Sequence, residues 1–130
     1  MRAHITAAIA IILLAATPGA AGARGGGDDE VRVAGTCGGG VKSKLKVKAD
    51  DGALEVEVEV EHARRGSAWR LTLVQEGRVV WRGSARAGRG SGRFAVARRL
   101  RDLAGADRIG VRASGPGGVS CRAAATLPGA

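Results

Sequence analysis

Arginine is concentrated in the second half of this sequence. Residues 62–130 carry 14 arginines and 3 acidic side chains, hence a net charge of +11, whereas residues 24–61 carry 6 basic and 9 acidic side chains, hence −3. A strong local excess of positive charge attracts polyanions. GC-rich codon usage also favours arginine over lysine, and this compositional explanation stays open beside the functional one.

Residues suited to catalysis are few. His62 is the only histidine beyond the N-terminal segment, and no serine lies in a Gly-x-Ser-x-Gly motif. The glycines at 88, 90 and 92 lack the flanking strand and helix of a nucleotide-binding loop. A calcium-binding or catalytic role for the glutamates of residues 54–61 is a weaker interpretation than a structural one, because lysines are available as their partners. We expect a non-catalytic protein without a cofactor or a metal site.

Two cysteines, Cys37 and Cys121, follow the N-terminal segment. An isolated pair in an oxidising compartment most simply forms one disulfide, which we predict here. Metal binding is the rival, but two thiols and one histidine cannot complete a tetrahedral zinc site. The bond would close a loop of about 85 residues, worth ~4.5 kcal/mol in chain-entropy estimates.

The first 23 residues have the pattern of a secretory signal. Arg2 and His4 precede an apolar stretch at 5–16, and Ala21-Gly22-Ala23 offers small residues for cleavage. The apolar stretch is shorter than the roughly 20 residues that a membrane-spanning helix needs. We therefore expect a signal peptide at 1–23, a flexible arm at 24–36 and a secreted, extracellular protein with no integral membrane segment.

Two alternating segments, residues 41–48 and 54–61, predict a hairpin around Asp50-Asp51-Gly52. A loop of two or four residues gives the same register, which places lysines opposite glutamates and aliphatic residues opposite each other. The expected pairs are Lys48–Glu55, Lys46–Glu57, Lys44–Glu59, Lys42–Glu61, Val47–Val56 and Leu45–Val58.

Five further short strands are predicted by the same alternation. They cover residues 69–74, 78–82, 93–97, 108–113 and 119–127, separated by a flexible loop at 85–92, a corner at 100–107 and a turn at 115–118. Seven strands without helix-length periodicity predict an all-β fold, a single antiparallel β-sandwich at residues 37–127. Strands one and seven then run the same way, which brings Cys37 and Cys121 to the same end of the sandwich.

The strand order is similar to that of fibronectin type III and immunoglobulin-like domains. Trp69 lies on the third strand, and a leucine-containing corner precedes the segment 109–113, which reads Ile-Gly-Val-Arg-Ala. Ile109 stands where those domains carry a corner tyrosine. The resemblance is architectural and implies no function.

The chain also resembles small, mostly uncharacterised secreted proteins of GC-rich Gram-positive bacteria. The shared motifs are a Gly-Thr-Cys at 35–37, the Asp-Asp-Gly turn between lysine- and glutamate-alternating strands, and Trp-Arg-Leu at 69–71. This second resemblance implies a fold and a location but no activity.

The arginines lead to the main functional hypothesis. Six of them occupy outward positions on strands three, four, six and seven, which should form one sheet: Arg70, Arg78, Arg82, Arg108, Arg112 and Arg122. Arg86, Arg89 and Arg93 extend the charge along the loop. We expect a monomer that binds an anionic polymer such as a teichoic acid or an acidic glycan. Scarce aromatic residues argue against sequence-specific nucleic-acid binding.

A second hypothesis is a protein-binding module, such as an inhibitor of a secreted hydrolase. Its partner would be another secreted protein, bound through the loops at 85–92 or 115–118.

Overall fold

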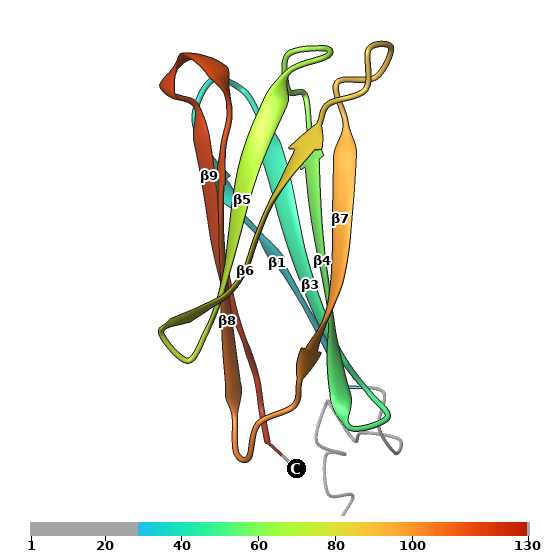
Figure 1. Cartoon of the computed structure of the whole chain (residues 1–130), viewed down its shortest axis with the longest axis vertical. Coiled ribbons are helices and arrows are strands. Elements are labelled where there is room, and N and C mark those ends of the chain that lie inside the picture. Colours follow the sequence, from blue (N-terminus) through green and yellow to red (C-terminus); the bar gives the residue numbers. More distant parts are fainter. Residues whose placement is uncertain (1–28, 130) are drawn as a thin grey trace, which may run out of the picture.

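The computed structural model describes residues 29–129 (Figure 1). The expected signal peptide at 1–23 and the first part of the expected arm lie outside the described residues. Within them, no helix has the length and hydropathy needed to cross a bilayer.

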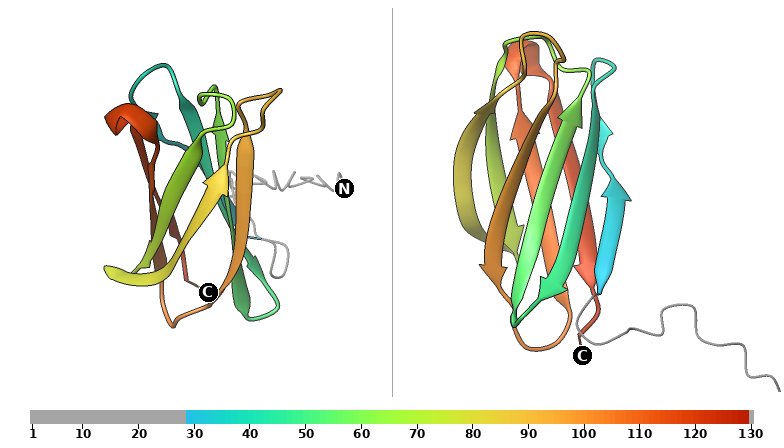
Figure 2. Two further views of the ribbon diagram at one scale, coloured as in Figure 1. Left: turned by 45° about the horizontal axis from the view of Figure 1, so that its top comes forward. Right: turned by 90° about the vertical axis from the view of Figure 1, so that its right-hand side faces the viewer.

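Two antiparallel sheets form the molecule, as expected for a β-sandwich (Figure 2). The lysine–glutamate sheet has the order β1-β3-β4-β7, with β1 (Glu30–Ala34), β3 (Lys42–Asp50), β4 (Ala53–Glu61) and β7 (Phe94–Arg101). The arginine sheet has the order β2-β9-β8-β5-β6, with β2 (Thr36–Cys37), β9 (Ser120–Leu127), β8 (Asp107–Ser114), β5 (Ala68–Gln75) and β6 (Arg78–Arg86). A 3-10 turn, η1 (Pro116–Gly118), joins β8 to β9.

The hairpin of β3 and β4 has the predicted register. Lys48 lies opposite Glu55, and the remaining lysine–glutamate and aliphatic pairs follow as expected along the two strands. The apolar positions of both strands are buried and the charged ones face outward. Charge pairing and apolar burial therefore select the same register.

The disulfide between Cys37 and Cys121 is present, with the two Cα atoms 4.1 Å apart. It joins β2 to β9, where the two cysteines are also direct partners in the sheet register. Both residues lie at one end of the sandwich, as the alternation of strand directions predicts.

The segment before Cys37 differs from the expected flexible arm, because residues 30–37 form β1 and β2. β1 pairs with β3 and β2 with β9, so this segment passes from one sheet to the other. Val31 and Val33 alternate with charged residues and pack against the core, which holds β1 in place. At the crossover, a side chain on Gly35 would collide with Ser43 and the carbonyl oxygen of Arg122.

The core fills the space between the sheets. Its largest buried side chain is Trp69, whose ring lies 5.7 Å from that of Phe94. The buried aliphatic residues come from both sheets: Leu45, Val47, Leu54, Val56, Val58, Val60, Leu71, Leu73, Ile109, Val111 and Leu127. On the side opposite β1 and β2, the Arg98 guanidinium stacks 4.5 Å from the Trp81 ring and links β7 to β6.

Two strands, β6 and β7, extend four residues beyond their expected ends. β6 continues to Arg86, so the predicted loop at 85–92 begins only at Ala87. That loop is tied to its neighbours: the Ala87 N–H donates to the Ser67 carbonyl at 2.8 Å, and the Ala63 N–H donates to the Gly92 carbonyl at 3.0 Å. β7 continues to Arg101, and residues 102–106 of the predicted corner contain no helical turn.

Candidate anion-binding site

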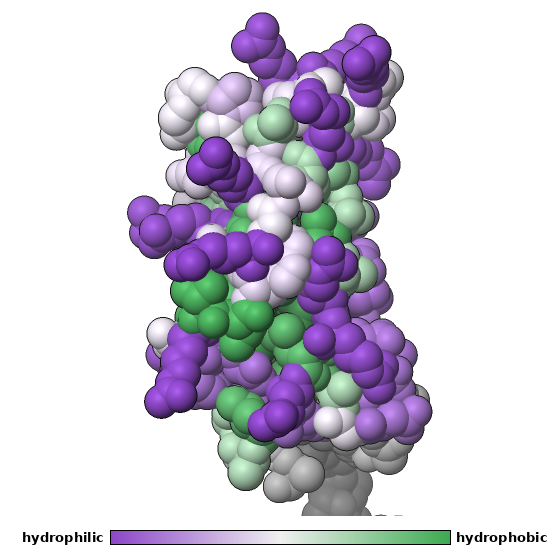
Figure 3. Space-filling model, viewed as in Figure 1, coloured by the Kyte–Doolittle hydropathy of each residue, from purple (hydrophilic) through white to green (hydrophobic). Residues whose placement is uncertain are grey.

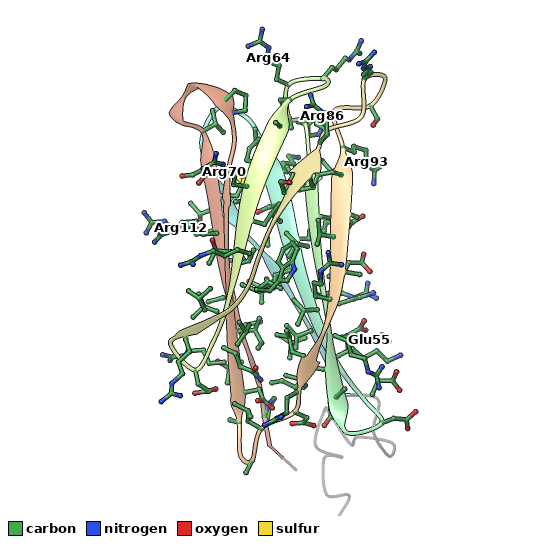
Figure 4. The ribbon with its side chains drawn as sticks, in the orientation of Figure 1. Glu55, Arg64, Arg70, Arg86, Arg93 and Arg112 are labelled. Atoms are coloured by element: carbon green, nitrogen blue, oxygen red, sulfur yellow. A yellow bond between two sulfur atoms is a disulfide. The ribbon has the colours of Figure 1, made fainter. Side chains whose placement is uncertain are left out.

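The outer face of the arginine sheet carries five of the six predicted arginines. On β5, β8 and β9 the inward residues are largely buried, so strict alternation turns the arginines toward solvent. Figure 4 shows Arg112 pointing away from the sandwich on the left of the view, whereas Glu55 lies on the opposite sheet. Of the six predicted arginines, the five on this face are all exposed: Arg70, Arg82, Arg108, Arg112 and Arg122.

Three of these arginines lie in one row that crosses the strands. Thr72 pairs with Arg82 on one side and with Arg112 on the other. Arg112 pairs with Arg122, which pairs in turn with Thr36. We call this line of five residues the arginine row. Strands in a sheet are about 4.8 Å apart, so Arg112 and Arg122 are one spacing apart, and Arg82 and Arg112 are about 10 Å apart.

Arg78 does not belong to this face, which corrects the sequence-based assignment. It pairs with Gln75, whose side chain is buried on the core side of β5. The register of β5 and β6 shifts between Leu73 and Val74, which leaves Val80 without a partner as a bulge. The extra residue reverses which side chains of β6 face the core on the two sides of the bulge. Arg78 therefore lies on the core side of β6, where it is exposed because it is the first residue of the strand.

No ion pair neutralises the arginine row within residues 29–129, because no carboxylate oxygen lies within 4.0 Å of its guanidinium nitrogens. The outward strand positions of the arginine sheet hold no acidic residue in this part of the chain. Glu76, in the turn between β5 and β6, accepts the backbone N–H of Arg108 at 2.5 Å. As far as residues 29–129 are concerned, the face is therefore a patch of positive charge without acidic partners.

The other sheet has the opposite arrangement. The Lys46 Nζ lies 3.5 Å from a Glu57 oxygen, and Arg99 lies 3.7 Å from Glu55. The hollows of this sheet are lined by both lysines and glutamates. The outer face of this sheet is also rich in charged side chains, but its positive and negative charges neutralise each other.

A groove runs beside the arginine row. It has a volume of about 690 Å³, with Gly110 and Ala124 at its floor and Arg82, Arg112 and Arg122 along one side. Binding pockets for small ligands commonly have volumes of about 300–1,000 Å³. Thr36, Thr72 and Gly110 contribute to this site although sequence reasoning did not single them out. The alternation Arg70-Leu71-Thr72 could have placed Thr72 on the same face as Arg70.

The three arginines that were predicted to extend the charge lie in different parts of the structure. Arg93 forms ion pairs with Glu59 and Glu61, at 3.7 and 3.1 Å, so it belongs to the lysine–glutamate sheet. Arg86 is the last residue of β6, where it pairs with Ala68 and faces outward like Arg82, so it does extend the positive charge of this face. Its guanidinium donates to the Gly66 carbonyl at 2.8 Å. Arg89 is exposed in the loop after β6.

The remaining polar groups have structural partners or lie in solvent. His62 is exposed in the turn after β4, with a positive φ of 61°. The Ser67 hydroxyl donates to the Arg64 carbonyl and accepts the Trp69 indole N–H at 2.9 Å. The described residues contain no group of three or more side chains arranged to hold a metal ion.

Comparison with known proteins adds no family to this description: no protein-family model and no curated protein matches the sequence. A function can therefore be inferred only from the sequence and the structure of this protein, in which the arginine row is the most distinctive surface feature.

Proposed function

We propose that this protein is a secreted, non-catalytic module that binds an anionic polymer through the arginine row. Polymers with suitable chemistry include teichoic acids and acidic glycans of the cell envelope or extracellular space. Positive charge held on a rigid sheet attracts such polymers and raises their association rate. The strands fix the spacing of the arginines, so little ordering of the backbone is needed on binding.

The observation that carries this proposal is the direct pairing of Arg112 with Arg122. Like charges opposite each other destabilise a sheet, by roughly 0.2–1 kcal/mol per pair. The β3–β4 hairpin of the same protein matches every lysine with a glutamate. A polyanion would supply the negative charge that the arginine sheet lacks, which gives this unfavourable arrangement a function.

Secretion is part of the proposal and depends on the N-terminal sequence pattern. The Cys37–Cys121 disulfide supports it, since such bonds persist mainly in oxidising compartments. Anionic envelope polymers are found in the same compartment, so location and ligand agree.

The test compares two variants that remove the same charge from different sheets. The first changes Arg82, Arg112 and Arg122 to serine, and the second changes Lys42, Lys44 and Lys48 to serine. We expect the arginine variant to elute from heparin resin and from purified cell-wall material at lower salt. The slope of log affinity against log salt should fall by about one for each arginine in contact, as it does for phosphate contacts in nucleic acids.

The lysine variant is the control, because it lowers the net charge by the same amount and leaves the arginine row intact. It should keep most of the retention. The arginine variant should be at least as stable to urea as the wild type, because it removes the unfavourable Arg112–Arg122 pair. The lysine variant should be somewhat less stable, because it removes three cross-strand pairs with glutamates. An equal loss of retention in the two variants would contradict a defined site and leave only a basic protein.

A protein-binding role is the second candidate, and one observation favours it. The loops after β4, β6 and β8 gather at the same end of the sandwich (Figure 1, top). A salt-resistant, stoichiometric complex with one secreted protein, unaffected by the arginine variant, would support this role instead.

A further inference from the structure

An uncharged row lies immediately beside the arginine row on the same face. Val74 pairs with Val79 on β6 and with Gly110 on β8, and Gly110 pairs with Ala124 on β9. These four residues follow the arginine row one step along the strands and form the floor of the groove. In Figure 3, a hydrophobic area lies directly below hydrophilic side chains on the left of the view. A ligand here meets guanidinium groups on one side and small apolar side chains on the other.

The floor of the groove offers no aromatic side chain on which a flat ring of a ligand could stack. No aromatic side chain lies on this outer face in the part of the chain that the structure describes. Trp69 and Phe94 are buried in the core, and Trp81 faces Arg98 on the core side of β6. Stacking on aromatic side chains is a main way in which proteins hold the bases of single-stranded nucleic acids. The groove offers no such platform.

We propose that the natural ligand is a linear, acyclic phosphodiester polymer, such as a poly(alditol phosphate), which crosses the strands along the groove. This inference rests on the proposed function and specifies its ligand. Arginine forks match phosphate oxygens, and the hydroxyls of Thr36 and Thr72 can donate further hydrogen bonds. The polyol segments lie over Gly110 and Ala124. In such a polymer the charge recurs along the backbone itself, so several phosphates can contact arginines of the row.

Gly110 provides a specific test of the groove. A Cβ added there meets nothing closer than 3.9 Å, and the residue has no positive φ, so a larger side chain fits without backbone strain. An isoleucine at this position would fill the groove and keep every arginine. Ala97→Ile is the matched control, since Ala97 is exposed on β7, on the outer face of the other sheet.

The measurement is the affinity of each variant for a glycerol phosphate oligomer and for an oligogalacturonate of equal charge. We expect Gly110→Ile to weaken binding of the phosphodiester oligomer about tenfold or more, the equivalent of ~1.4 kcal/mol. Ala97→Ile should bind as the wild type does, and the glycan should bind more weakly than the phosphodiester. Ala124→Ile fills the same floor from β9 and replaces Gly110→Ile if that variant does not fold.

The outcomes separate this inference from the proposed function. Unchanged binding after filling the groove, together with a loss in the arginine variant, would overturn the groove and keep polyanion binding. Equal or tighter binding of the glycan would overturn the phosphodiester preference alone. Failure of the wild type to bind either oligomer at low salt would overturn both.

Discussion

Asp107 is buried at the start of β8, with 2 % of its surface exposed. Its carboxylate accepts the backbone N–H of Leu103 at 3.2 Å and the Gln75 amide N–H at 3.3 Å. Burial raises the pKa of Asp107, and the neighbouring Asp102 raises it further, against the lowering effect of these two donors. The group therefore holds its proton to higher pH in the folded protein than in the unfolded chain.

This raised pKa predicts an unusual pH dependence for one carboxylate. The contribution of Asp107 to the free energy of unfolding is greatest at a pH below the ordinary pKa of aspartate. It is lost as the pH rises through the raised pKa of the folded protein. In Asp107→Asn the free energy of unfolding should fall less steeply with rising pH. The variant should be at least as stable as the wild type at pH 7, because its amide oxygen can still accept both hydrogen bonds. Urea unfolding from pH 3 to 7 measures the effect. A steeper decline in the variant would show that the carboxylate is favoured in its ionised form.

At the scale of elements, the β3–β4 hairpin contains a ladder of opposite charges in register. Lys46 contacts both Glu57 and Glu30, at 3.5 and 3.9 Å, and so connects three strands. Partly exposed pairs of this kind each contribute about 0.2–1 kcal/mol.

Charge exchange at this position tests the register. Lys46→Glu should lower stability by about 1 kcal/mol, because it places three carboxylates together. Adding Glu57→Lys should restore most of the loss, but not all of it, since Glu30 remains close to the carboxylate introduced on β3. Urea midpoints of the two single variants and the double variant give the coupling energy. Strictly additive effects would mean that these two side chains do not interact.

The sequence predicts this hairpin well because charge and hydropathy alternate there with the same period. The same reasoning missed β1, although Val31 and Val33 alternate with Glu30 and Arg32. That alternating pattern covers only five residues beside a glycine-rich stretch. The segment forms a strand because β3 has a free edge with which it can pair. A local pattern contains no information about such an edge.

The error at Arg78 has a different physical origin. Val79 and Val80 are adjacent apolar residues, so alternation along β6 breaks at this point. The break marks the bulge, but the sequence does not say which of the two residues loses its partner. The arginine row could be predicted from the outward positions of Arg82, Arg112 and Arg122, whereas the groove depends on the pairing of several strands.

For the whole molecule, the fold converts a difference in net charge between two halves of the sequence into a difference in charge between the two outer faces of the sandwich. The glutamates of residues 30–61 lie on β1 and β4, on either side of the lysines of β3, while β5, β6, β8 and β9 place arginines together on the other sheet. Under the proposed function, a polyanion would therefore approach the side of the sandwich that carries the arginine sheet. Charge of this kind orients a partner before contact and gives binding a strong salt dependence.

Amide chemical shifts during titration with a glycerol phosphate oligomer test the binding site most directly. We predict that the largest changes occur on the outer face of the arginine sheet, at Thr72, Gly110, Arg112 and Arg122, and fade as salt is added. Amides of β3 and β4 should change little. Changes centred on the loops after β4, β6 and β8, or spread evenly over both sheets, would contradict a binding site at the arginine row.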